Sequence, residues 1–82
     1  MKIYAVEETI DLGSHVRGLF LKKSEAIDYI VFLKNESYNK CPENNKDYWN
    51  VWCAHTYRGC EYEVDKREDG KKFFVDMFGK EV

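Results

Sequence analysis

Three cysteines and two histidines are the residues of this chain best suited to metal or nucleophilic chemistry. Cys53 and His55 are two positions apart, so on a β-strand they would share a face with their Cβ atoms about 7 Å apart. Cys41 or Cys60 could complete a set of metal ligands. Structural zinc usually takes two ligands from a tight turn such as C-x-x-C, which this sequence lacks. We therefore expect no metal and interpret Cys53 and Cys60 as small core residues.

Nucleophilic catalysis also finds little support. Cys53 or Cys60 could pair with His55, but no third group that would orient the histidine is identifiable. Ser14 and His15 are neighbours in a turn-forming segment, which does not make a catalytic dyad. The sequence has no G-x-S-x-G elbow, P-loop or G-x-G-x-x-G fingerprint. We therefore expect no enzymatic activity and no cofactor. The alternative is a small-ligand or metal-binding domain that uses Cys53, His55 and the tryptophans.

Composition narrows the remaining classes of protein. The length of 82 residues fits one domain spanning residues 1–82. The formal net charge of −2 provides no basic field for nucleic acid, and Trp49 and Trp52 lie in a segment with no nearby run of positive charges. No apolar run is long enough to cross a bilayer, and the first residues lack a signal-peptide core. Together with the odd number of cysteines, these features predict a cytoplasmic protein that binds neither membrane nor nucleic acid.

The first half of the chain predicts a β-hairpin followed by a helix. Residues 2–10 and 16–21 are expected strands, joined by turn-forming residues 11–14. Ser24 is a suitable N-cap, so a helix is expected from there to about Ser37. Its apolar arc contains Ala26, Ile27, Ile30, Val31 and Leu33. Residues 38–47 are expected to form a loop.

The second half predicts further strands. Asp69-Gly70 is a strong signal for a two-residue hairpin, because both central positions of a type I′ turn need positive φ. That turn would pair Val64 with Val75 and Tyr62 with Met77. Arg58-Gly59 either closes another hairpin, which we favour, or forms a bulge within one long strand.

The expected fold is therefore α+β. Its element order is β-β-α-β-β-β, with one antiparallel sheet of four to five strands and one helix packed on one face.

Residues 18–26 carry a family resemblance in the sequence G-L-F-L-K-K-S-E-A. This segment resembles small uncharacterised proteins of phages and Gram-positive bacteria, in which a β-hairpin leads through a G-x-F-x-(S/K)-x-E-A segment into an amphipathic helix. The resemblance covers about residues 2–37. It implies the fold and a phage or mobile-element setting, and it implies no activity and no functional residues.

Two groups of aromatic residues lie where core residues are not expected. On the helix, Phe32 falls in the middle of the polar arc and Tyr29 at its edge, so Phe32 is either covered by the loop at 38–47 or exposed for a partner. On the expected sheet, a second group combines aromatics with carboxylates on one face: Trp52, Phe74 and Phe78 with Glu61, Glu63 and Asp65. This second group is either an ordinary solvent face or a docking surface for a basic protein.

These features predict a non-enzymatic protein-binding module, with the sheet surface as the preferred binding site. In the setting that the resemblance implies, its role would be to modulate or inhibit a host protein. The same surface could instead join two copies in a homodimer.

Overall fold

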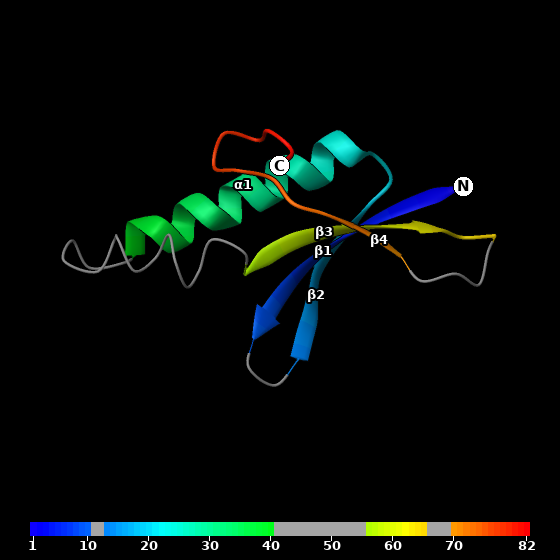
Figure 1. Ribbon diagram of the computed structural model, residues 1–82, viewed down its shortest axis with the longest axis horizontal. Coiled ribbons are helices and arrows are strands. Elements are labelled where there is room, and N and C mark those ends of the chain that lie inside the picture. Colours follow the sequence, from blue (N-terminus) through cyan, green and yellow to red (C-terminus); the bar gives the residue numbers. More distant parts are fainter. Residues whose placement is uncertain (11–12, 41–55, 66–69) are drawn as a thin grey trace.

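The computed structural model describes residues 1–10, 13–40, 56–65 and 70–82 (Figure 1). Its four strands form one antiparallel sheet in the order β2-β1-β3-β4, and one helix lies across one face of that sheet (Figure 1). The elements, in chain order, are β1 (Lys2–Ile10), β2 (Gly13–Phe20), α1 (Lys23–Lys40), β3 (Tyr57–Glu63) and β4 (Lys71–Phe73). The predicted α+β fold is thus confirmed. The fifth strand, expected just before Tyr57, lies mostly outside the described residues.

The helix is confirmed and is longer than predicted. Its acidic first-turn residue, Glu25, and its last-turn Lys40 both complement the helix dipole. Because α1 continues to Lys40, residues 38–40 of the expected loop are helical, and the remainder of that loop lies outside the described residues. The described part of the chain contains no helix long and apolar enough to cross a membrane.

The β1–β2 hairpin contains a bulge that changes which side chains share a face. Gly13 opens β2 with a φ of 136°, a conformation that favours glycine. Val6 pairs with Gly18 and Glu7 pairs with Val16, so Arg17 is the extra residue on β2. The bulge therefore shifts the alternation of β2 side chains by one position.

The core lies between the sheet and α1. Val6 and Ile30 are fully buried, and burial of each such side chain stabilises the fold by roughly 1.5 to 3 kcal/mol. The buried cluster consists of Val6, Ala26, Ile30, Leu33, Phe73 and Val75. Ile27 and Val31, also expected in the core, are only partly buried, and they lie close to Gly79 in the chain after β4.

The hairpin predicted at Arg58-Gly59 is wrong, and so is the bulge considered in its place. Strand β3 runs without interruption through Gly59 and pairs with β1 in one unbroken register from Tyr57 to Glu63. Gly59 is needed for packing, because a Cβ at this position would overlap the ring of Phe73. A local turn signal was thus overridden by a close contact with a residue fourteen positions later.

The hairpin between β3 and β4 exists, but its predicted register is wrong. Phe73 pairs with Gly59, Cys60 with Lys72 and Glu61 with Lys71, so the expected pairs of Val64 with Val75 and Tyr62 with Met77 do not form. Asp69 lies outside the described residues. This register places the Phe73 ring over Gly59 inside the core, where burial outweighs the preference of a two-residue turn.

The chain after β4 folds back on the helix layer, and the orange-to-red segment of Figure 1 runs beside α1. Val75 is buried and forms an isolated bridge with Glu81. Lys34, only 4% exposed, donates a hydrogen bond of 2.5 Å from its Nζ to the carbonyl oxygen of Val75. Burial lowers the pKa of this ammonium, which is the expected effect of desolvating a charge. Lys34 therefore joins α1 to the end of the chain.

The substitution Gly59→Ala tests the contact between β3 and β4. We expect it to lower the free energy of unfolding by about 1 to 3 kcal/mol, because the methyl group would displace the Phe73 ring. Gly18→Ala is the matched control, since it is also in a strand but its Cβ would lie 3.1 to 3.3 Å from side chains of Phe20 and Tyr29. Urea denaturation of both variants measures the difference. Equal stabilities would contradict the packing described.

Candidate protein-binding surfaces

The outer face of α1 displays a fixed aromatic pair. Phe32 is 58% exposed, so the question left open by the sequence is answered in favour of exposure. Its ring stacks on Tyr29 with centroids 6.3 Å apart and planes inclined by 10°. Tyr29 in turn contacts Phe20 at the end of β2, at a centroid distance of 5.5 Å. Phe20 and Tyr29 pack against the core, so Phe32 projects from a supported position.

A groove runs beside Phe32 along the second half of α1. It has a volume of about 380 Å³ and is lined by Phe32, Asn35, Glu36, Asn39 and Lys40. Lys40 and Glu36 form an ion pair of 2.8 Å across one turn, and this contact raises the pKa of Lys40. The groove is therefore electrically balanced at its far end and apolar where the Phe32 ring forms its wall.

The surroundings of Phe32 are acidic on the side toward the start of the helix. At 100° per residue, Glu25, Asp28, Phe32 and Glu36 fall on one outer stripe. Glu25 and Asp28 are exposed, and neither carboxylate forms an ion pair with another residue of the described ranges. Since Lys40 offsets Glu36, the negative charge of this stripe comes from Glu25 and Asp28.

The aromatic and acidic residues predicted to form one surface on the sheet do not come together in the structure. Trp52 lies outside the described residues. Glu61 is in an ion pair of 3.5 Å with Lys2, and Glu63 and Asp65 contact the Met1 ammonium at 2.9 and 3.3 Å. The hydrogen bond that the Met1 ammonium donates to Glu63 is the main reason why the pKa of that ammonium is raised. The three carboxylates are therefore beside cations of the same chain.

Phe74 and Phe78 do not lie on one common surface. Phe74 follows β4 and is half-buried, whereas Phe78 is 95% exposed on the chain that packs against α1. Next to Phe78, Gly79 lies close to Ile27 and Val31 of the helix. The register that would have aligned Phe74 and Phe78 with the β3 carboxylates does not form. Of the predicted set, Glu61 and Phe74 line a common pocket.

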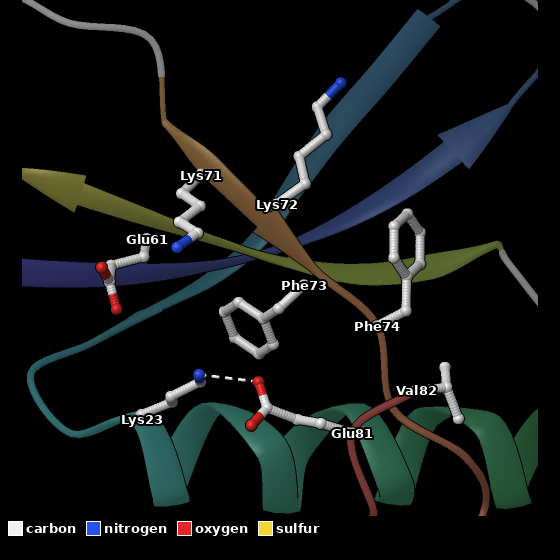
Figure 2. A pocket seen from close by; sticks show the side chains of 8 residues that line it. All are labelled: Lys23, Glu61, Lys71, Lys72, Phe73, Phe74, Glu81 and Val82. Carbon is white, nitrogen blue, oxygen red and sulfur yellow. Dashed lines mark ion pairs between the residues drawn. The ribbon is translucent and has the colours of Figure 1, made fainter.

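This pocket lies at the β4 edge of the sheet, near the start of α1 (Figure 2). It has a volume of about 280 Å³ and is lined by Lys23, Glu61, Lys71, Lys72, Phe73, Phe74, Glu81 and Val82. Lys23 forms an ion pair of 2.6 Å with Glu81, which raises the pKa of Lys23, and its Nζ lies 4.8 Å from the centroid of the Phe73 ring. Of the charged groups in the lining, Lys23 and Glu81 pair with each other, and Glu61 pairs with Lys2 outside it.

A polar cluster that the sequence did not reveal lies on the sheet face away from α1. Glu7 is buried, and its carboxylate accepts hydrogen bonds from Arg58 Nε at 3.1 Å and from the Tyr62 hydroxyl at 3.3 Å. A hydrogen bond with Cys60 is the main cause of the raised pKa of Tyr62. No sequence pattern could have joined these residues, because β1 and β3 are about fifty positions apart.

Of the cysteines and the histidine considered for metal binding or catalysis, the structure describes Cys60. Cys60 is 2% exposed, which agrees with its interpretation as a small core residue. Cys41, Cys53 and His55 lie outside the described residues. Within the described ranges, no three histidine, cysteine, aspartate or glutamate side chains are grouped so that they could hold a metal ion.

Comparisons with models of protein families, with curated proteins and with solved structures gave no match. The case for a function therefore rests on the surfaces of this chain, of which the outer face of α1 combines exposure, rigidity and charge.

The carboxylate of Asp76 shapes the turn that displays Phe78. It accepts hydrogen bonds from the backbone N–H groups of Phe78 at 2.8 Å and Lys80 at 2.9 Å, and these bonds lower the pKa of Asp76. A lowered carboxyl pKa stabilises the folded turn above the pKa of the unfolded chain, and this contribution is lost as the pH falls through the folded-state pKa.

We expect Asp76→Ala to speed hydrogen exchange at the Phe78 and Lys80 amides at neutral pH, because both N–H groups lose their acceptor. NMR-detected exchange measures this, with Asp28→Ala on the helix as the control. Unchanged exchange at both amides in Asp76→Ala would show that the carboxylate does not hold the turn.

Proposed function

We propose that this chain is a non-enzymatic protein-binding module that binds a basic partner on the outer face of α1. In the phage or mobile-element setting that the family resemblance implies, it would act as a modulator or inhibitor of a host protein. The observation that carries the proposal is the Phe32 ring, which is 58% exposed and stacked on a tyrosine that is itself anchored in the core.

Rigidity is what makes this ring suited to binding. Aromatic side chains supply much of the energy at protein interfaces, and binding costs entropy for each side chain that must be ordered. Tyr29 restricts the Phe32 ring before any partner arrives, so little of that cost remains. The adjoining groove of about 380 Å³ offers space for a partner side chain beside the ring.

The charge of the stripe supports a basic partner. Glu25 and Asp28 precede Phe32 on the same outer face of α1, and among the described residues neither has a cation paired with it. Exposed carboxylates of this kind accelerate the approach of a cationic surface and penalise an acidic one. The Glu61, Glu63 and Asp65 carboxylates are less suited to this role, because Lys2 and the Met1 ammonium already offset their charge.

A non-enzymatic role is supported by the burial of Cys60, the candidate nucleophile that lies in the described part of the chain. Cys60 is buried, and the nearby Glu7 is engaged by Arg58 and Tyr62. A substrate would have little access to a thiol that is 2% exposed. No observation on the described residues favours the alternative of a ligand or metal site at Cys53 and His55.

The first test is capture of the partner and loss of binding on truncation of Phe32. The immobilised chain is incubated with an extract of the source cell, and bound proteins are identified by mass spectrometry. With the captured protein in hand, we expect Phe32→Ala to weaken binding by about 1 to 3 kcal/mol, because the ring would be a central contact. Phe78→Ala is the control, since Phe78 is even more exposed but lies outside the stripe. Full loss with Phe78→Ala and none with Phe32→Ala would place the binding site on the C-terminal turn.

The second test concerns charge. We expect the double substitution Glu25→Lys and Asp28→Lys to slow association and to reduce its dependence on salt, with little change in the dissociation rate. The matched control is Glu61→Lys with Asp65→Lys, which reverses the same number of charges on the sheet. Surface plasmon resonance at two salt concentrations measures both rates. Slower association in the control pair alone would transfer the steering role to the sheet carboxylates.

A further inference from the structure

The sheet face turned away from α1 has exposed apolar side chains at one edge and an apolar hollow at the other. Residues directly opposite each other in antiparallel strands share a face. One row across the four strands on this face is Leu19, Ala5, Cys60 and Lys72, and the next row is Val16, Glu7 and Arg58. The helix lies on the other side of the sheet (Figure 1).

The bulge at Arg17 is the reason why two large side chains gather at one edge of this face. Val16 and Leu19 are three positions apart and would lie on opposite faces of a regular strand. The bulge brings Val16 opposite Glu7 and Leu19 opposite Ala5, so both side chains lie on the face away from α1. Val16 is 59% exposed and Leu19 is 65% exposed, and together they form a ridge on β2.

The opposite edge of the same face is hollow. An apolar hollow of about 450 Å³ is lined by Thr9, Arg58, Phe74 and Val82. Arg58 stands in the same row as Val16, because both are paired with Glu7, on opposite sides of β1. The face thus has a ridge along β2 and a hollow toward β4 at the same height along the strands.

The charges of the second row are balanced within the chain, whereas Lys72 in the first row is exposed and forms no ion pair with another described residue. The buried carboxylate of Glu7 is paired with Arg58, and Arg58 also donates to the Ser14 hydroxyl at 3.1 Å. In a two-fold interface only residues near the axis meet their own copies, so the paired Glu7 and Arg58 on the two central strands add no like-charge repulsion there.

We propose that a second copy of this chain docks on this face in a two-fold symmetric dimer of stacked sheets. A two-fold axis parallel to the strands and between β1 and β3 places β2 of each copy over β4 of the other, because the strand order is β2-β1-β3-β4. Val16 of each copy then enters the hollow beside Phe74 of the other. Two sheets stacked in this way pack about 10 Å apart and leave both α1 helices on the outside.

Sedimentation velocity of the full chain over a range from low to high micromolar concentration tests the dimer. We expect the weight-average mass to rise from 9.8 kDa toward twice that value. Val16→Asp should raise the dimer dissociation constant at least tenfold, because it places a carboxylate in the apolar hollow of the other copy. Phe78→Asp is the control and should leave that constant unchanged. A mass of 9.8 kDa at every concentration, or equal effects of the two variants, would overturn the proposal.

Cysteine cross-linking distinguishes stacked sheets from pairing of two β2 edges. In the stacked dimer, the two Val16 positions lie at opposite edges, so Val16→Cys should form no intermolecular disulfide beyond that of the unmodified chain under the same oxidant. Edge-to-edge pairing of β2 would bring the new thiols together. Rapid cross-linking of Val16→Cys would therefore overturn the stacked arrangement, and circular dichroism of each variant confirms that it is folded.

Discussion

The contact between the Phe73 ring and the backbone of Gly59 determines the arrangement of the second half of the chain. The ring occupies the space that a Cβ at position 59 would fill, and Phe73 is paired with Gly59 in the register of β4 with β3. With Phe73 placed there, Val75 follows into the core against α1. The end of the chain then lies along the helix, where Lys34 and Asn35 donate hydrogen bonds to its carbonyl groups.

This arrangement gives the two outer faces of the molecule different characters. The helix has the sheet on one side and the end of the chain on another, so the stripe from Glu25 to Glu36 is the face left to solvent. That stripe is acidic and carries a supported aromatic ring. The sheet face away from the helix exposes Val16 and Leu19, and its Glu7 is paired with Arg58. An acidic face suits a basic partner, whereas an apolar ridge beside an apolar hollow suits a second copy.

The sequence predicted what depends on local patterns. Helical periodicity identified α1, its buried Ala26, Ile30 and Leu33, and the misplaced Phe32, because each of these follows from angle around one helix. Periodicity could not identify Lys34 as buried, because its hydrogen-bond partner Val75 is 41 positions away. The stacking of Phe32 on Tyr29 could have been predicted from the sequence, since residues three apart on a helix are neighbours.

The sequence failed where a distant residue decided the outcome. The turn signal at Arg58-Gly59 was outweighed by the seven paired residues that β3 shares with β1. The two-residue turn at Asp69-Gly70 would have excluded Phe73 from the space above Gly59. Because the predicted sheet surface was built on that register, the structure separates its members: Glu63 and Asp65 contact Met1, and Phe78 lies on the helix layer.

The most direct test of the binding surface is an NMR map of the isotope-labelled chain titrated with the protein that it captures. If a basic partner binds the outer face of α1, the largest shifts and the strongest line broadening will occur at residues 25, 28, 29, 32 and 36, while Val16 and Leu19 on the sheet stay unchanged. Shifts concentrated in β3 and β4, with α1 unaffected, would contradict the proposed site.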